Sequence, residues 1–147
     1  MLVKDVLKSK QKQLVTVNPK MTISQAMELL IGNKISSLPV VDEDGELVGI
    51  ISDKDIFKKI YETEGDYRVF TVAQLMTTEL IVGVVDDDLT YIAGLMTNNR
   101  IRHIPIMEKD RIIGIVSVGD IVKTQMEHIK IENRYLRQYL SGSHFSL

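Results

Sequence analysis

Apolar and polar positions follow the same order twice along the chain. Two apolar runs, 35–41 and 101–107, each contain one proline and are each followed by a polar turn. A second apolar run comes after each turn, at 47–51 and at 112–116. Apolar, partly β-branched runs that flank a short polar turn predict an antiparallel hairpin. The pattern therefore predicts two similar hairpins, one in each half of the chain.

The two hairpins are separated by a nearly constant distance in sequence. Pro39 and Pro105 are 66 positions apart, and the offset becomes 65 after the turn, which is one residue shorter in the second hairpin. The pairs at this second offset are Gly49 and Gly114, Ser52 and Ser117, Asp55 and Asp120, and Ile56 and Ile121. Self-similarity at a fixed period is typical of a duplicated structural unit.

Helical periodicity flanks each hairpin. Before the first hairpin, apolar residues recur three and four apart from Ile23 to Ile31, with Thr22 as N-cap candidate and Gly32-Asn33 as the expected end. The corresponding helix of the second half is predicted over 89–98, with Asp88 as its cap; we interpret 86–88 as turn and cap residues and not as a metal site.

The remaining elements complete two similar repeats. Short strands are expected at 14–17 and 80–85, a single helical turn near the N-terminus, and a helix over 53–61 after the first hairpin. The helix after the second hairpin continues towards Leu140. Each repeat thus reads strand, helix, strand, strand, helix.

These elements predict a mixed α/β (α+β) fold with an extended C-terminal helix. We assign residues 1–61 to repeat 1, 62–70 to a charged linker, 71–125 to repeat 2, and 126–147 to a C-terminal helical extension and tail. Each half has too few elements to cover its own sheet, so we expect the repeats to pack about a pseudo-twofold axis. Such packing leaves two related clefts with different side chains.

The predicted C-terminal helix has a heptad-like apolar seam. The seam residues are spaced 4, 3, 4, 3 and 4 apart: Val122, Met126, Ile129, Asn133, Leu136 and Leu140. A single polar Asn in such a seam fixes the register of a coiled coil. Packing on the parent domain and self-association both explain the seam, and the pattern leaves the choice open.

Composition narrows the function classes further. The net charge of −2 gives no general attraction to nucleic acid, and no apolar run approaches the length that spans a bilayer. The chain has no cysteine, which excludes disulfides and thiolate chemistry. Lys8, Lys10 and Lys12 form a small basic patch, which we interpret as a solvated loop. We expect a cytoplasmic protein with no membrane association.

The duplicated segment, a strand with a proline, a hairpin, then Gly-apolar-apolar-Ser-x-x-Asp, resembles a tandem pair of CBS domains, also called a Bateman module. The resemblance covers about residues 1–125. It implies regulatory binding of an adenine nucleotide, with AMP as the leading candidate and ADP, ATP, NAD or S-adenosylmethionine as alternatives. It also favours a homodimer, because Bateman modules commonly pair face to face into discs.

The resemblance implies roles for individual residues. Asp55 and Asp120 would accept hydrogen bonds from ribose hydroxyls, as ionised carboxylates can. Phosphate contacts would come from Ser52, Lys54, Arg102, His103 and Ser117. Adenine would lie among Thr16, Val17, Ile35, Val82, Gly83 and Ile101.

Two alternatives affect these roles. Ser-x-x-Asp at a helix start is also the pattern of a capping box, in which the Asp faces its own helix. Arg102 and His103 correspond to the uncharged Ser36 and Ser37, so we expect the cleft of Arg102, His103, Ser117 and Asp120 to be the stronger nucleotide site.

The sequence favours a stand-alone, non-catalytic ligand sensor acting on a regulated protein that it does not identify. No nucleophile elbow, zinc-protease motif, P-loop or acid–base carboxylate pair is present, and no cofactor is expected. The alternative is a structural, adaptor or nucleic-acid-binding CBS protein without a nucleotide ligand.

Overall fold

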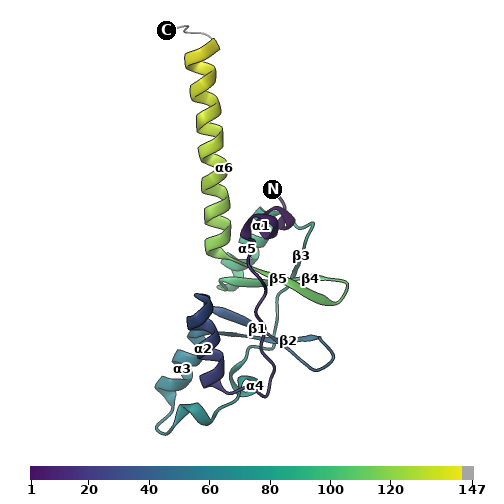
Figure 1. Cartoon of the computed structure of the whole chain (residues 1–147), viewed down its shortest axis with the longest axis vertical. Helices are drawn as coiled ribbons and strands as arrows, with labels where there is room; N and C mark the ends of the chain where they lie inside the picture. Colours follow the sequence, from purple (N-terminus) through teal and green to yellow (C-terminus); the bar gives the residue numbers. More distant parts are fainter. Residues whose placement is uncertain (144–147) are drawn as a thin grey trace.

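The computed structural model describes residues 1–143 and contains two similar sets of elements (Figure 1). The first set is α1 (Val3–Lys10), α2 (Ile23–Asn33), β1 (Ser37–Val41), β2 (Leu47–Ser52) and α3 (Asp53–Glu62). The second is α4 (Val72–Leu75), β3 (Gly83–Val84), α5 (Leu89–Asn99), β4 (His103–Glu108), β5 (Arg111–Ser117) and α6 (Val118–Gln138). A short 3-10 helix, Tyr67–Val69, lies between the sets, and a π-helical segment, Tyr139–Ser143, follows α6. The predicted mixed fold with a long C-terminal helix is confirmed, and only residues 144–147 of the predicted tail lie outside the described residues.

Each set contains one small sheet built on an antiparallel hairpin. β1 pairs with β2 and β4 pairs with β5, as predicted. In the second sheet β3 adds a parallel strand through Gly83 and Ile106. In the first sheet the residues 66 positions earlier, Val17 and Val40, form the same parallel pair as a single bridge. The register of the two sheets is therefore duplicated together with the sequence.

The first strand of each repeat is shorter than the sequence predicted. The run 14–17 contributes only the bridge at Val17, because the turn at Asn18-Pro19 follows at once. The run 80–85 contributes only Gly83 and Val84, and the N–H of Val84 donates to the Asp87 side chain at 2.8 Å in the turn that follows. A turn thus follows directly after each of the two strands.

Most helix ends and turns are determined by residues that are close in sequence. Thr22 and Asp88 cap α2 and α5, as predicted. Gly45, in the first hairpin turn, has φ +81°, which glycine adopts without steric cost. The end of α2 was predicted one residue early, because the left-handed C-cap is Lys34. The predicted N-terminal helical turn is an eight-residue helix, α1.

The two hydrophobic cores exchange their N-terminal segments. The first core is built on β1 and β2 and includes Val72 from α4. The second is built on β4 and β5 and includes Val3 and Val6 from α1. Figure 1 shows α1 beside α5 in the upper half and α4 below β1 and β2. We call these two assemblies the first unit and the second unit.

Helix α6 begins inside the second unit and leaves it. Ile121 is buried in the second core, whereas every described side chain from Gln125 to Ser141 is exposed. Figure 1 shows the helix projecting away from both units. Among the described helices, none is long and apolar enough to cross a membrane.

Candidate functional site

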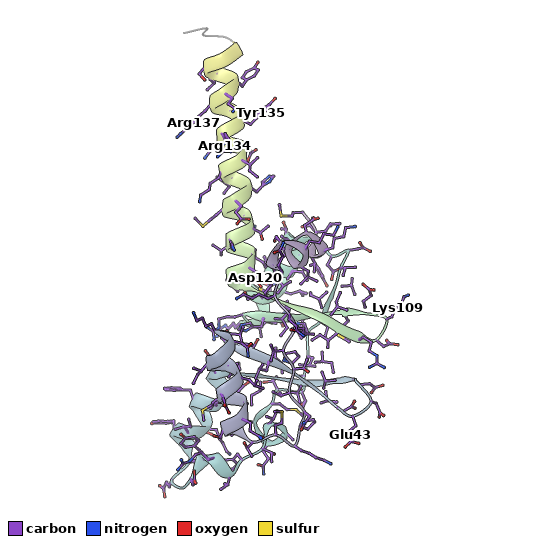
Figure 2. All side chains as sticks on the ribbon, viewed as in Figure 1. Glu43, Lys109, Asp120, Arg134, Tyr135 and Arg137 are labelled. Carbon is purple, nitrogen blue, oxygen red and sulfur yellow. The ribbon has the colours of Figure 1, made fainter. Side chains whose placement is uncertain are left out.

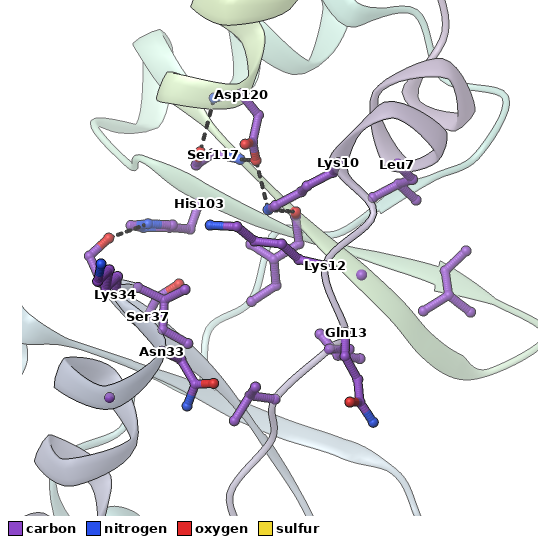
Figure 3. Close-up of a pocket in the computed structure, with 18 residues that line it drawn as sticks. Leu7, Lys10, Lys12, Gln13, Asn33, Lys34, Ser37, His103, Ser117 and Asp120 are labelled. Atoms are coloured by element: carbon purple, nitrogen blue, oxygen red, sulfur yellow. Dashed lines mark hydrogen bonds and ion pairs between the residues drawn. The ribbon is translucent and has the colours of Figure 1, made fainter.

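A cavity of about 800 Å³ lies between the two units (Figure 3). The first unit and the segment that leads into it contribute Gln13, Leu14, Val15, Gly32, Asn33, Lys34, Ile35, Ser36 and Ser37. The second unit, with α1 and Lys12 just after it, contributes Leu7, Lys10, Lys12, His103, Ile113, Gly114, Ile115, Ser117 and Asp120. The cavity therefore combines residues just before β1 of the first unit with residues at the start of α6 in the second unit.

Asp120 lies at the start of α6 and lines this cavity while capping its own helix. Its Oδ2 accepts the N–H of Ser117 at 2.9 Å, and the N–H of Asp120 donates to Ser117 Oγ at 3.1 Å. This is the capping box that the sequence left as an alternative. The two interpretations are compatible here, because Asp120 caps its own helix through Oδ2 and lines the cavity at the same time.

Lys10, the last residue of α1, forms an ion pair with the same carboxylate. Its Nζ donates to Asp120 Oδ2 at 2.8 Å and to the carbonyl oxygen of Ile115 at 2.8 Å. Partial burial by itself raises the pKa of the Asp120 carboxyl, but the hydrogen bonds from Lys10 and from the Ser117 N–H outweigh it and keep the pKa below its usual value. Asp120 is therefore ionised at neutral pH and can accept hydroxyl hydrogen bonds.

Three lysines give one part of the cavity a positive potential. Lys10 terminates α1, Lys12 follows it, and Lys34 is the left-handed residue after α2; all three line the cavity. Figure 3 shows Lys10 and Lys12 extending toward the space beside His103 and Asp120. Such a cluster favours an anionic ligand group. The sequence predicted a solvated loop for this basic patch; that is wrong for Lys10, which is partly buried at the end of α1, whereas Lys12 is exposed after the helix and also lines the cavity.

His103 connects the two units at the edge of the cavity. Its Nε2 lies 2.8 Å from the hydroxyl oxygen of Ser36. Burial is the main cause that lowers the pKa of His103, and the charge of Arg102 lowers it further, while Asp53 opposes the shift. The imidazole is consequently neutral at pH 7 and serves as a hydrogen-bonding group.

Apolar side chains line the rest of the cavity. Val15, Ile35, Ile113 and Ile115 face it from both units. The alternation of the segment around Val15 explains why its neighbour Thr16 is exposed and takes no part. A mainly apolar wall with a few polar groups is typical of small-molecule pockets.

The structure brings together only some of the residues predicted from sequence. Four of them line the cavity: Ile35, His103, Ser117 and Asp120. The others do not line it: Thr16, Val17, Ser52, Lys54, Asp55, Val82, Gly83, Ile101 and Arg102. Val17 and Gly83 instead belong to the interiors of the two units, and Val82 is exposed.

Arg102 lies apart from Asp120, with which the sequence analysis had grouped it. Its guanidinium is 3.4 Å from Asp53 at the start of α3, and its carbonyl oxygen accepts the N–H of Val118. The reason is that the two units pack in a crossed arrangement. The residues just before β1 lie near the start of α6, and Arg102, just before β4, lies near the start of α3. Lys10, and not Arg102, is therefore the cation beside Asp120.

The equivalent region around Asp55 has a different arrangement. Asp55 forms a capping box with Ser52, through bonds of 2.9 and 3.3 Å. The carbonyl of Ile50, which corresponds to Ile115, accepts the backbone N–H of Thr77 at 2.8 Å. A lysine side chain therefore fills this position in the second repeat, and the main chain fills it in the first.

The comparison with known protein families matches both repeats of the chain. The family model for the CBS domain matches residues 3–62 and again residues 72–127, which is more than half of the chain. The chain belongs to the CBS domain family. The CBS domain-containing protein YhcV of Bacillus subtilis is 34% identical over 116 residues, which are 79% of this chain and 81% of that protein. The predicted tandem CBS pair is thereby confirmed.

Solved CBS structures share the fold. A CBS-domain containing protein from Agrobacterium tumefaciens has a TM-score of 0.80 and 32% identity, covering 84% of this chain and 92% of that one. The CBS domain pair of protein MJ0100, in complex with 5′-methylthioadenosine and S-adenosyl-L-methionine, has a TM-score of 0.78 and 32% identity. The match covers 87% of this chain and 98% of that one. Adenosine-containing ligands thus bind a similar CBS pair.

Some relatives are enzymes, but they match through a small part of their length. Inosine-5′-monophosphate dehydrogenase of Mycobacterium bovis is 35% identical over 112 residues, which are 76% of this chain and only 20% of the enzyme. Proteins consisting of a CBS domain pair are generally regulatory.

Proposed function

We propose that this CBS pair is a non-catalytic sensor that binds an adenine nucleotide, with AMP as the leading candidate, in the cavity between the two units. The observation that supports this most directly is the juxtaposition of an ionised Asp120 with three lysines and an apolar wall in one cavity. These are the groups that a ribose, a phosphate and a base require.

Within this proposal each part of the ligand has its own contacts. The carboxylate of Asp120 accepts ribose hydroxyls, and the base lies against Val15 and Ile35. The phosphate is held by Lys12, Lys34 and the Ser117 hydroxyl. The ligands of the MJ0100 pair contain no phosphate. The lysines here favour an anionic ligand over 5′-methylthioadenosine, which is neutral, or S-adenosyl-L-methionine, whose sulfonium is cationic.

The second cleft is proposed as a weaker site. There Asp55 would accept ribose hydroxyls, with Ser52, Lys54 and Arg102 near the phosphate. Arg102 is already paired with Asp53 at 3.4 Å, so a ligand has to compete with that carboxylate. We propose that ligand binding in the cavity beside Asp120 produces the regulatory response, because Asp120 lies in the first turn of α6.

Thermal unfolding with AMP, ADP, ATP, adenosine, 5′-methylthioadenosine and S-adenosyl-L-methionine tests the proposal. A ligand at 100 times its Kd stabilises the folded state by about 2.7 kcal/mol, which raises Tm by several degrees. We expect AMP to raise Tm more than adenosine does.

Asp120→Asn and Asp55→Asn form a matched pair for this experiment, because both residues occupy the same position of a capping box. We expect Asp120→Asn to abolish the AMP-dependent rise and Asp55→Asn to retain most of it. No rise with any of the six compounds, or an equal loss in both variants, contradicts the proposal.

A further inference from the structure

The exposed part of α6 stands clear of both units. All described side chains from Gln125 to Ser141 are exposed, and Figure 2 shows them projecting from a helix that stands clear of both units. An isolated helix of about 15 residues is marginal in water, because most helical stability in proteins comes from tertiary packing. The length of this helix therefore points to an external partner.

One face of α6 is apolar along its whole length. Val122, Met126, Ile129, Leu136 and Leu140 are each exposed by 48–54%. They recur at intervals of four and three, with Asn133 occupying one position of the series. This is the a/d seam of a coiled coil, with Met126, Asn133 and Leu140 at a positions and the other three at d.

The second unit lies on the opposite side of the helix from this seam. The residues of α6 that face the second unit are Asp120, Ile121 and Thr124, which occupy positions b, c and f. In a two-stranded coiled coil these are the outward positions. A second helix can therefore approach the seam without meeting the second unit.

The charges beside the seam select the orientation of that second helix. The e positions are Lys123, Lys130 and Arg137, all cationic, and Glu132 is at g. In an antiparallel pair the e positions face each other, which would align cations against cations. In a parallel pair Glu132 faces Arg137 of the second copy, and Asn133 faces its own equivalent.

We propose that α6 forms a parallel, in-register, two-stranded coiled coil with α6 of a second copy of this chain. The inference rests on α6 alone and does not depend on the nucleotide proposal. The helix begins at the capping box of Asp120, so the coiled coil would join the two cavities of the dimer through continuous helices.

Single-cysteine variants test this arrangement directly, because the chain has no cysteine of its own. Ile129 is at a d position and Ile131, two residues away, is at the outward f position; both are exposed. Under a glutathione redox buffer we expect Ile129→Cys to form disulfide-linked dimers at least about ten times faster than Ile131→Cys. Equal rates at the two positions overturn the proposal.

Two further variants distinguish the orientation. In a parallel dimer Met126→Cys and Leu136→Cys each cross-link to an identical chain. An antiparallel dimer centred on residue 131 instead links Met126→Cys to Leu136→Cys when the two proteins are mixed. Formation of the mixed species alone overturns the parallel arrangement.

A charge exchange gives a second, solution measurement. By sedimentation equilibrium we expect Glu132→Arg and Arg137→Glu each to weaken dimerisation about five-fold or more, because each places like charges together across the seam. The double exchange restores Kd to within about two-fold of the original. A double variant as weak as the single ones, or an original protein that stays monomeric at the highest soluble concentration, overturns the proposal.

Discussion

Lys10 and Asp120 are 110 positions apart in the chain and form an ion pair with 2.8 Å between Nζ and Oδ2. The lysine ends a helix that packs on the second unit, and the aspartate begins the long helix that leaves it. The pair fixes the carboxylate that we assign to ribose binding, and it closes one side of the cavity between the units.

Removing the lysine tests the contribution of the pair to stability. In Lys10→Met the partly buried Asp120 and the carbonyl of Ile115 lose their shared donor. We expect the free energy of unfolding to fall by about 1–3 kcal/mol, the usual range for a hydrogen bond to a charged group. Urea denaturation measures this change in the free energy of unfolding. Lys8→Met, on the exposed side of α1, serves as the control and should change stability by less than about 0.5 kcal/mol.

Lys12 and Lys34 should affect ligand binding without affecting stability. Both are exposed, line the cavity and form no ion pair within the described residues. We expect Lys12→Ala and Lys34→Ala each to weaken AMP binding about 5- to 20-fold and to change adenosine binding by less than about two-fold. Isothermal titration calorimetry compares the two ligands. Equal losses for AMP and adenosine would place the phosphate elsewhere.

Acid should weaken the folded state through Asp120. Its pKa in the folded protein is lower than the ordinary value of 3.8, so below that value the unfolded state binds more protons than the folded state does. The stabilisation is complete above about pH 4 and is lost as the pH falls through the folded pKa. We expect the stability difference between the original protein and Asp120→Asn to narrow between pH 4 and pH 2.5 in urea titrations. A constant difference across this range contradicts the assignment.

His103 should produce a second pH dependence, at higher pH. Its folded pKa is lowered from 6.5, chiefly by burial, so the stability associated with the neutral ring is complete above about pH 6.5 and falls as the pH drops through the folded pKa. We expect this loss between pH 6.5 and pH 5 in the original protein and its absence in His103→Gln. His128→Gln, on the exposed part of α6, should behave as the original protein does.

The exchange of segments between the units predicts the behaviour of chain fragments. Fragment 1–66 lacks Val72, and fragment 67–147 lacks Val3 and Val6, all three of which are fully buried. We expect each fragment alone to lack a cooperative thermal transition by circular dichroism, and an equimolar mixture to regain one. A fragment that unfolds cooperatively alone would mean that its core is complete without the exchanged segment.

Local features of this fold were accessible from the sequence because short-range interactions determine them. The hairpins, the caps at Thr22 and Asp88, and the positive φ of Gly45 depend on residues within a few positions of each other. The strand lengths were overestimated, because turns follow directly after Val17 and after Val84. Family membership followed from the duplication, which is itself a property of the sequence.

The composition of the cavity was predicted only in part. Ser117 and Asp120 were identified from the repeated Ser-x-x-Asp, whereas Lys10, Lys12 and Lys34 were missed because they lie outside that motif. Arg102 was grouped with Asp120 because the two belong to the same repeat, yet it faces Asp53 of the other repeat. Proximity in a motif was a poor guide to proximity in the cavity.

The sequence by itself determined that there are two equivalent hairpin-and-helix repeats and that Thr22 and Asp88 cap the helix before each hairpin. The tertiary structure alone decided which segments complete each core and which charges meet between the units. The physical reason is that the apolar faces of α1 and α4 are short and similar, and the two cores that could receive them are near copies. Only the complete packing of both cores selects the crossed arrangement, and with it the contact between Lys10 and Asp120.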